Sequence, residues 1–467
     1  MSKIREKAFW IAVGDFGGRG LAFLTTIYLA RTLGSEFYGL ITVAVSVLGY
    51  ATWGADLGLL NIGVREIAKE PEERIFRSKE IFNLKVILAS SVLLIATIGI
   101  SYTSISAIQK QIILGYLYSL IPYALLLDWY YSGKQHFGKL AFSKIINGAV
   151  YFGLVYWLIT SAENVTLVPI LYTVGITSAV VVLGTFSLTD KPFTLPTRGF
   201  STYLKLIKTS STIGLGGFFA QVVQLLPPIL IGIFLSLKDA GIYGAAFRVI
   251  MIAMMLDRIF VNLLLPNLSS LWSSNKESAI QKVNMVLRLV IVGGALLTVL
   301  VVINAEQIIL LLYGADFTGS IEILQVLSIF IFLTFINSLF SFGLIATNND
   351  KKYFKATCIG GSISAVIISV FAINGTEISV SFAVVAAELI LTASSYFWFK
   401  KVIPLEFFRP VMVIILISGL LFFGFKELDV HYIISSLISI ILIPVLSWYT
   451  RVIRIGELNW LKEKLWK

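Results

Sequence analysis

The charged side chains that lie deep in apolar stretches are the residues of this sequence best suited to chemistry. They are Arg19, Arg248, Asp257, Arg258 and Glu388. A charge near the centre of a bilayer costs roughly 2.5 to 3.5 kcal/mol, so such residues face a polar cavity or a partner. Arginine suits an anionic ligand because its planar guanidinium donates paired hydrogen bonds and stays charged. The sequence therefore predicts a cationic, substrate-binding cavity formed by Arg19, Arg248 and Arg258.

The deep acidic residues admit two interpretations. Asp15, Asp257 and Glu388 are predicted either to bind a coupling ion or to belong to a charge network with no role in binding. In the second interpretation Asp15 neutralises Arg19 four residues later on the same helix face, and Asp257, Arg258 and Glu388 form an interhelical ion network. The spacing alone leaves both open.

Other charges lie nearer the ends of apolar stretches. Lys85, Lys144 and Arg288 are within a turn or two of such an end, so their long side chains are predicted to reach water and anchor the helices. Similar edge positions are occupied by Asp56, Asp128 and Glu322. None of these six is predicted to bind substrate.

The elements that must position these charges are membrane-spanning helices. Of the 467 residues 57% are hydrophobic and 13% are charged, and the mean hydropathy is +0.88. A water-soluble protein of this size could not bury so much apolar surface. Apolar stretches of about 20 residues recur, which suits helices crossing a ~30 Å hydrocarbon layer, and the alternation typical of a β-barrel is missing from the sequence. The first stretch, near Phe9, is expected to be retained rather than cleaved as a signal peptide.

Charged residues, glycine and proline divide the chain into about fourteen predicted spans. The first six are near residues 9–31, 37–60, 80–101, 109–131, 139–160 and 165–188, the next six near 206–235, 240–268, 282–304, 319–345, 355–374 and 379–399, and the last two near 407–425 and 431–450. The predicted organisation is an N-terminal six-helix bundle (1–188), a cytoplasmic connector (189–204), a C-terminal six-helix bundle (205–400), and two additional spans with a cytoplasmic tail (401–467).

The distribution of lysine and arginine orients these spans. Basic residues gather in every second loop, as in the segment between the second and third spans, and both terminal segments are basic. The opposite loops and their edges hold few basic residues, namely Arg31, Lys110, Lys238 and Lys426. Because cytoplasmic loops are enriched in basic residues, the pattern predicts that both termini are cytoplasmic.

Several function classes are excluded or disfavoured. One cysteine, Cys358, and two distant histidines, His136 and His431, argue against a metal site or disulfide scaffold, and we expect no cofactor. The predicted loops leave no room for a soluble catalytic domain, and the sequence has no Walker A motif, so we expect a protein that is not an enzyme. The net charge of +11 reflects loop orientation rather than a nucleic-acid partner.

A weak internal repeat joins equivalent positions of the two predicted bundles. The turn from Leu33 to Gly39 reads LGSEFYG, and the turn from Leu237 to Gly244 reads LKDAGIYG. Parallel repeats of this kind imply two bundles with a site at their interface. Gly34 is predicted to end a helix in a left-handed cap, with Ser35 starting the next helix. In the seventh span, Pro227 and Pro228 are predicted to bend the helix.

Three motifs carry a family resemblance. They are Ala30–Gly39 (ARTLGSEFYG), Asp56–Leu59 (DLGL) followed by Arg65-Glu66, and Leu311–Phe317 (LLYGADF). The chain resembles the polysaccharide flippases of the multidrug/oligosaccharidyl-lipid/polysaccharide exporter superfamily. The resemblance implies a fold like that of the multidrug exporters: two six-helix bundles that open alternately to either side. Related lipid II flippases carry basic residues on the first, second and eighth helices, whereas the second span here offers Asp56.

The resemblance implies a secondary transporter, or flippase, that moves a polyprenyl-diphosphate-linked oligosaccharide across the cytoplasmic membrane by alternating access for surface polysaccharide biosynthesis. The expected partners are that lipid-linked oligosaccharide, membrane lipid, and polysaccharide polymerases and glycosyltransferases, and we expect a monomer. The alternative is a multidrug or organic-cation exporter of the same superfamily, which would rely on acidic rather than basic cavity residues. A scaffold for polysaccharide enzymes would tolerate the loss of Arg19 and Arg248.

Overall fold

The predicted all-helical architecture is confirmed. The computed structural model describes residues 3–70, 75–190, 192, 199–257, 268, 271–272, 274–428 and 430–453. Over these ranges the regular elements are helices, and no strand occurs among them. The chain divides into two compact units, Met1–Gly241 and Ile242–Lys467. The predicted connector at 189–204 rests on the charged residues and prolines of that stretch rather than on compactness, and it stays a prediction.

Among the described residues, 12 helices are long and apolar enough to cross a membrane, or up to 13 if the bent pair Phe200–Ala220 and Val222–Phe234 is one span. The first of these, Phe9–Asp56, has 48 residues. At ~1.5 Å per residue such a helix is more than twice as long as a ~30 Å hydrocarbon layer is thick. The protein is therefore a multi-pass membrane protein, and the count of fourteen spans stays a prediction.

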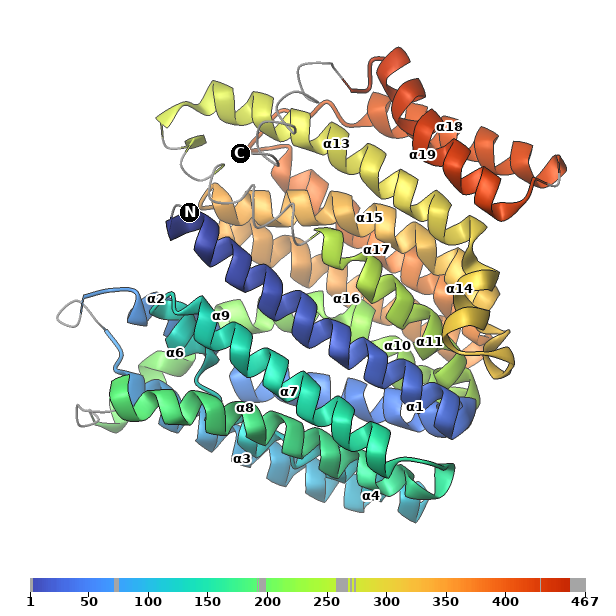
Figure 1. Ribbon diagram of the computed structural model, residues 1–467. Helices are drawn as coiled ribbons and strands as arrows, with labels where there is room; N and C mark the ends of the chain where they lie inside the picture. Colours follow the sequence, from blue (N-terminus) through green and yellow to red (C-terminus); the bar gives the residue numbers. More distant parts are fainter. Residues whose placement is uncertain are drawn as a thin grey trace. The chain divides into compact units, whose positions relative to one another are not determined.

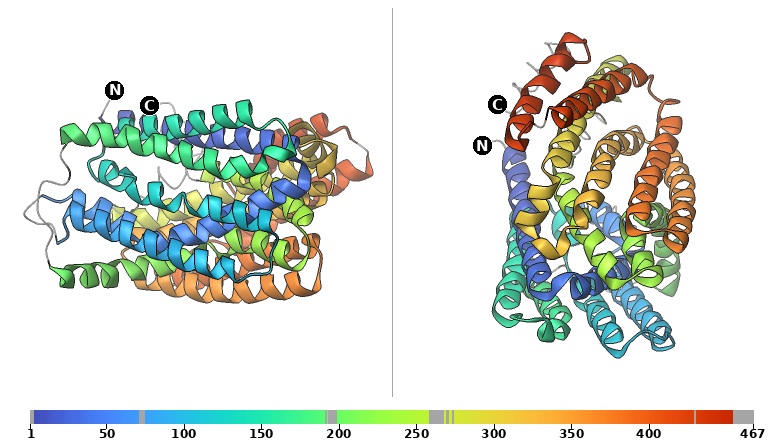
Figure 2. Two further views of the ribbon diagram at one scale, coloured as in Figure 1. Left: turned by 90° about the horizontal axis from the view of Figure 1, so that it is seen from below. Right: turned by 90° about the vertical axis from the view of Figure 1, so that its right-hand side faces the viewer.

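The N-terminal unit is built on one long helix, α1 (Lys3–Asp56) (Figure 1). The other α-helices of this unit are α2 (Leu59–Ile67), α3 (Ser78–Ser101), α4 (Ala107–Leu117), α5 (Leu120–Leu125), α6 (Asp128–Gly133), α7 (Phe137–Leu158), α8 (Val168–Asp190), α9 (Phe200–Ala220) and α10 (Val222–Phe234). Helix α7 packs against both α1 and α8 (Figure 2). Helix α1 also contacts α3, α4 and α10.

Helix α1 changes direction at a single glycine. Gly34 has φ 74° and ψ 173°, a conformation open essentially to glycine alone. The positive φ expected from the sequence is confirmed, but ψ is extended, so the predicted left-handed cap is wrong in this detail. The first two predicted spans are thus joined without a loop.

The C-terminal unit contains most of α11 (Leu237–Ala253), together with α13 (Lys276–Ile303), α14 (Ala305–Leu312), α15 (Ser320–Ala346), α16 (Asp350–Asn374), α17 (Glu377–Phe399), α18 (Phe408–Glu427) and α19 (Tyr432–Tyr449). Helix α17 lies beside α15 and α16 (Figure 1). Helix α13 packs against α15, α18 and α19. Within this unit the core is centred on α15, where 17 of the 27 residues are buried.

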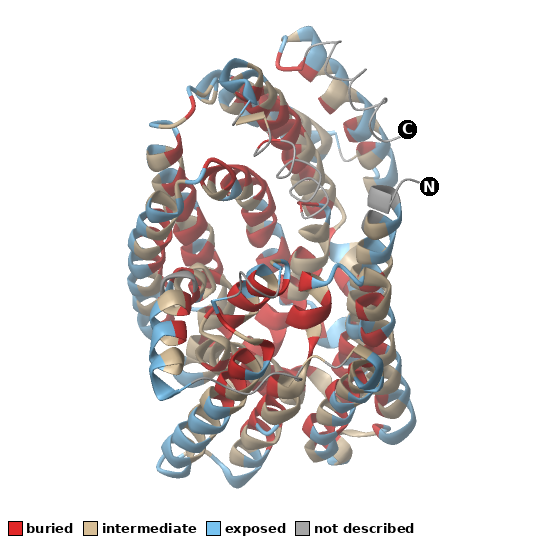
Figure 3. Ribbon diagram, turned by 90° about the vertical axis from the view of Figure 1, so that its left-hand side faces the viewer, coloured by how far each residue is buried: buried red, intermediate tan, exposed pale blue. Residues whose placement is uncertain are grey.

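The outward helix faces are apolar. Along α18 and α19 the exposed large side chains include Phe408, Met412, Leu420, Phe423 and Trp448. Figure 3 shows buried and exposed residues on opposite sides of the helices. An apolar face of this extent would be unfavourable in water and is suited to lipid acyl chains.

The bend of the seventh predicted span lies just before its prolines. Helices α9 and α10 meet at Gln221 with a bend of 55°, and Pro227 and Pro228 lie inside α10. A proline disturbs the carbonyl four residues earlier, which places the disturbance at positions 223 and 224. A bend is present in the predicted span, but it lies at Gln221, nearly two turns nearer the N-terminus than the prolines.

The two copies of the repeated turn meet each other within the N-terminal unit. A Cβ added at Gly39 would lie 1.7 Å from the Leu237 carbonyl oxygen, and one added at Gly241 would lie 1.9 Å from the Ser35 carbonyl oxygen. The contact is reciprocal, since each glycine faces the residue four positions before the other. Small residues allow such close helix approach in membranes.

Changing Gly39 to alanine should destabilise this contact severely. The added methyl group has no space against a backbone oxygen, which cannot move as a flexible side chain can. We expect the apparent Tm of the purified protein in detergent to fall by at least about 5 °C. Gly153→Ala is the matched control because nothing lies within 4 Å of its added Cβ. An equal fall in Tm for Gly39→Ala and Gly153→Ala would show that Gly39 does not make this close contact.

A buried carboxylate organises the segment that follows α2. The Glu66 side chain accepts hydrogen bonds from the backbone N–H of Ile75 at 2.7 Å and of Phe76 at 3.1 Å, and from the Lys69 ammonium at 2.7 Å. Burial alone would raise the pKa of Glu66, but these donors stabilise its charged form and hold the pKa below its usual value. The carboxylate therefore links the end of α2 to the backbone at Ile75 and Phe76.

The stabilisation by Glu66 should depend on pH. Because its folded pKa is lowered, the contribution is present at neutral pH and is lost as the pH falls through the folded pKa, below ~4.3. Glu66→Gln should cost ~1 to 3 kcal/mol at pH 7, seen as a lower Tm in detergent. The difference from the unmodified protein should shrink towards pH 3.5, and a difference that stays constant would refute this.

Candidate functional site

Arg19 lies on α1 in the N-terminal unit and is half-buried. Its predicted neutralising partner, Asp15, instead accepts a hydrogen bond at 2.6 Å from the Lys144 ammonium of α7. In the part of the chain that is described, no acidic group pairs with Arg19. The mutual neutralisation of Asp15 and Arg19 is therefore wrong, which leaves the guanidinium available to an anion.

Close packing holds Arg19 and its neighbours against α7. Cβ atoms added at Gly14 and Gly18 would lie 2.7 Å from the Ala141 Cα and 3.2 Å from the Lys144 carbonyl oxygen. Close approach of the two helices brings Lys144 beside Asp15, although 129 residues separate them in sequence. Gly14 and Gly18 thus act through packing.

Arg248 lies on α11 in the C-terminal unit and is also half-buried. None of the ion pairs among the described residues includes it. Arg258 lies outside the described residues. The cavity predicted from Arg19, Arg248 and Arg258 therefore stays a prediction, with the first two known to be without a described acidic partner.

Glu388 and Asp257, the deep acidic residues of the C-terminal unit, both accept hydrogen bonds from neutral side chains of α15. Glu388 of α17 is 3% exposed and accepts a hydrogen bond at 3.0 Å from the Asn337 amide of α15. Asp257 accepts one at 2.5 Å from the Ser338 hydroxyl, and it lies near enough to Glu388 for the two charges to repel each other. No described lysine or arginine forms an ion pair with Glu388.

This network extends along the facing sides of α15 and α17. The Ser341 hydroxyl donates to the Asn337 side-chain oxygen at 3.1 Å and lies 3.2 Å from the Ser395 hydroxyl. Sequence reasoning missed Asn337, Ser338 and Ser341, although polar residues spaced i, i+1 and i+4 in an apolar span were a usable signal. Two carboxylates among amides and hydroxyls favour binding of a cation or proton.

The predicted anchoring charges behave differently from one another. The side chain of Lys144 is 51% exposed, as expected of an anchor. Lys85 by contrast is buried, with only 2% of the whole residue exposed. Arg288 is 6% exposed and donates a hydrogen bond at 2.9 Å to the largely exposed Glu406 carboxylate. The anchoring prediction is wrong for Lys85, because the helices packed around it keep its ammonium from water.

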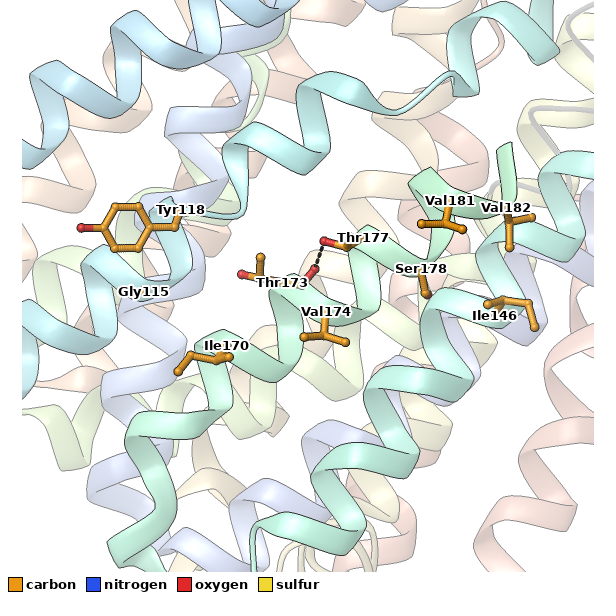
Figure 4. Close-up of a pocket in the computed structure, with 10 residues that line it drawn as sticks. All are labelled: Gly115, Tyr118, Ile146, Ile170, Thr173, Val174, Thr177, Ser178, Val181 and Val182. Atoms are coloured by element: carbon orange, nitrogen blue, oxygen red, sulfur yellow. Dashed lines mark hydrogen bonds between the residues drawn. The ribbon is translucent and has the colours of Figure 1, made fainter. Parts of the chain in front are cut away.

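A separate groove of about 660 Å³ lies between α4, α7 and α8 (Figure 4). Its lining residues are Gly115, Tyr118, Ile146, Ile170, Thr173, Val174, Thr177, Ser178, Val181 and Val182. The Thr173, Thr177 and Ser178 hydroxyls donate to carbonyl oxygens of their own helix. The lining contains no charged side chain, so this groove lacks the groups that would bind a diphosphate.

Among the described residues, no group of three or more histidine, cysteine or acidic side chains could hold a metal ion. The residues suited to binding a ligand are the two arginines without described acidic partners and the carboxylates deep within the spans.

Comparison with known proteins places these features in a family. Residues 4–272 match the model of the family described as polysaccharide biosynthesis protein. A protein of Haloferax volcanii named as a low-salt glycan biosynthesis flippase, Agl15, is 24% identical over 398 residues, which cover 80% of this chain and 79% of the relative. A protein of Escherichia coli K12 named as an O-antigen transporter is 20% identical over 410 residues, covering 84% and 95%.

Solved structures show the same fold. The lipid II flippase MurJ, in an inward closed conformation, matches with a TM-score of 0.71 and 16% identity over 94% of this chain and 98% of that one. An inward-facing multidrug resistance transporter of the MATE family matches with a TM-score of 0.66 and 13% identity over 82% and 93%. With more than half of its length matched by the family model, the chain belongs to the polysaccharide biosynthesis protein family.

Proposed function

We propose that this protein is a flippase, a secondary transporter that moves a polyprenyl-diphosphate-linked oligosaccharide across the cytoplasmic membrane for surface polysaccharide biosynthesis. The observation that carries the proposal is that Arg19, a half-buried cation within a membrane span, has no acidic partner among the described residues. The family and its relatives support it, because the Haloferax protein is named as a glycan biosynthesis flippase and the Escherichia protein as an O-antigen transporter.

The cationic site consists of Arg19, Arg248 and Arg258 in this proposal. A diphosphate carries a concentrated negative charge that guanidinium groups bind in pairs of hydrogen bonds. Alternating access would expose these groups first to one side of the membrane and then to the other. Both termini are cytoplasmic and the protein works as a monomer in this proposal, with polysaccharide polymerases and glycosyltransferases as its functional partners.

A multidrug exporter is the second candidate function. It is favoured by the buried carboxylates Asp257 and Glu388 and by the likeness of fold to a MATE family transporter. In the flippase, we assign the buried Glu388 to binding of the coupling ion instead, because the Asn337 amide that donates to it is neutral, and we place Asp257 in the same site. Asp15 has no such role, since Lys144 neutralises it.

Removal of the cavity arginines should abolish flipping. In proteoliposomes containing a fluorescent polyprenyl-diphosphate-linked oligosaccharide, Arg19→Ala and Arg248→Ala should each slow translocation at least about tenfold, because each removes a charge-assisted contact of ~1.5 to 3 kcal/mol. Lys238→Ala, which removes an exposed cation, should change nothing. Normal flipping by both arginine variants, or extrusion of organic cations alone, would refute the flippase.

Glu388→Gln should remove the coupling of cargo transport to the ion gradient. The amide keeps the size of the side chain and its contact with Asn337 but cannot exchange a proton or balance a cation. We expect exchange of labelled for unlabelled cargo to continue, while uptake driven by an imposed pH or sodium gradient falls at least about tenfold. Unchanged gradient-driven uptake would exclude Glu388 from coupling. Ser395→Ala, at the far end of the same network, is the control.

A further inference from the structure

Two helix breaks in the N-terminal unit bring three charged side chains together. Helix α1 ends at Asp56, and the positive φ angles of Leu57 (44°) and Gly58 (83°) turn the chain into α2. Helix α5 ends at Leu125, and α6 begins at Asp128. Charged residues placed at the breaks of discontinuous membrane helices are a recurrent way to build ion sites.

Neighbouring helices close around these breaks. Helix α3 packs against α5, and α2 packs against α6. Helix α9 seals the first break from the other side: a Cβ added at Gly58 would lie 2.6 Å from the Ser210 carbonyl oxygen, and one at Gly214 would lie 2.4 Å from the Leu57 carbonyl carbon. Lys85 projects from α3 into this region with its side chain only 3% exposed.

The ion pair at the helix breaks, between Lys85 and Asp56, lacks a direct hydrogen bond. The Lys85 ammonium lies 3.7 Å from Asp56 Oδ1, beyond hydrogen-bonding distance. Asp56 Oδ1 is itself buried without a hydrogen-bond partner, while the other oxygen accepts from the Leu60 N–H at 3.2 Å. The Lys144–Asp15 and Lys139–Asp190 pairs of the same unit are by contrast hydrogen-bonded at 2.6 and 2.8 Å.

The surrounding titratable groups leave an excess of negative charge. From α6, Asp128 lies near enough to repel Asp56, and its carboxylate accepts from the Trp129 N–H at 2.8 Å. From α5, Tyr123 faces both carboxylates and lies under the Lys85 ammonium at 6.0 Å. Beyond these lie Tyr172 of α8, next to Tyr123, and Tyr203 of α9, whose hydroxyl accepts from Asn83 of α3.

We propose that Asp56, Lys85 and Asp128 form a proton-binding centre in the N-terminal unit. Two carboxylates with one ammonium carry a net negative charge when all are ionised, and mutual repulsion in a poorly solvated site favours protonation of one carboxylate. A proton fits better than a metal ion, because the Lys85 ammonium, 3.7 Å from Asp56 Oδ1, would repel a second cation. This centre is separate from Asp257 and Glu388, and the proposal does not depend on the cargo.

Labelling with dicyclohexylcarbodiimide tests the centre, since this reagent modifies protonated carboxyl groups in apolar surroundings. On the purified full-length protein in detergent, peptide mass spectrometry should find Asp56 or Asp128 modified at least about fivefold more at pH 6 than at pH 9. Asp15, hydrogen-bonded to Lys144, is the internal control and should stay unmodified at both values. Absence of label on Asp56 and Asp128 between pH 5 and 9 would overturn the proposal.

Two substitutions should shift the labelling in opposite directions. Lys85→Gln removes the cation, so labelling should persist to pH 9. Asp128→Asn removes the repelling carboxylate, so labelling of Asp56 at pH 6 should fall at least about fivefold. Unshifted labelling in both monodisperse variants would mean that the three residues do not titrate together. If Lys85→Gln does not fold, Asp56→Asn replaces it, and because the repelling carboxylate is then gone, labelling of Asp128 at pH 6 should fall at least about fivefold.

Discussion

The whole structure depends on the fact that hydrocarbon offers no hydrogen bonds, so polar groups at depth must find partners within the chain. Many span hydroxyls bond to a carbonyl of their own helix, as Thr25 does to Leu21 and Ser46 does to Thr42. Charged groups cannot be satisfied so locally and need other helices. Asp15 reaches α7 for Lys144, and Glu388 reaches α15 for Asn337. The partners of the deep charges therefore determine which helices must stay adjacent.

The same constraint separates two kinds of polar site. Where opposite charges meet in a hydrogen-bonded pair, as Lys144 and Asp15 do, the two charges neutralise each other and the pair holds neighbouring helices together. Arg19, Glu388 and the pair Asp56–Lys85 are incomplete in the described residues: a cation without an anion, a carboxylate with neutral partners, and an ion pair too long for a hydrogen bond. Incomplete sites carry the energetic cost that a ligand can relieve.

Sequence patterns were sufficient for the fold class and for the family, because apolar length and turn motifs are local properties. The positive φ at Gly34 and the bend before Pro227 and Pro228 also followed from residue type. Pairing did not follow, since Asp15 has one possible partner four residues away and another 129 residues away, and only packing selects between them. Depth estimated from distance to a helix end failed for Lys85 because it ignores what neighbouring helices cover.

The junction at Gly34 has a mechanical consequence. The parts of helix α1 before and after Gly34 are joined by this one residue, whose ψ angle is extended. No flexible loop therefore lies between them. Tilting of the segment before Gly34 must therefore displace the start of the segment after it. Five residues after Gly34, at Gly39, that second segment packs closely against the Leu237 backbone. The part of α1 that follows Gly34 therefore lies in direct contact with the start of α11.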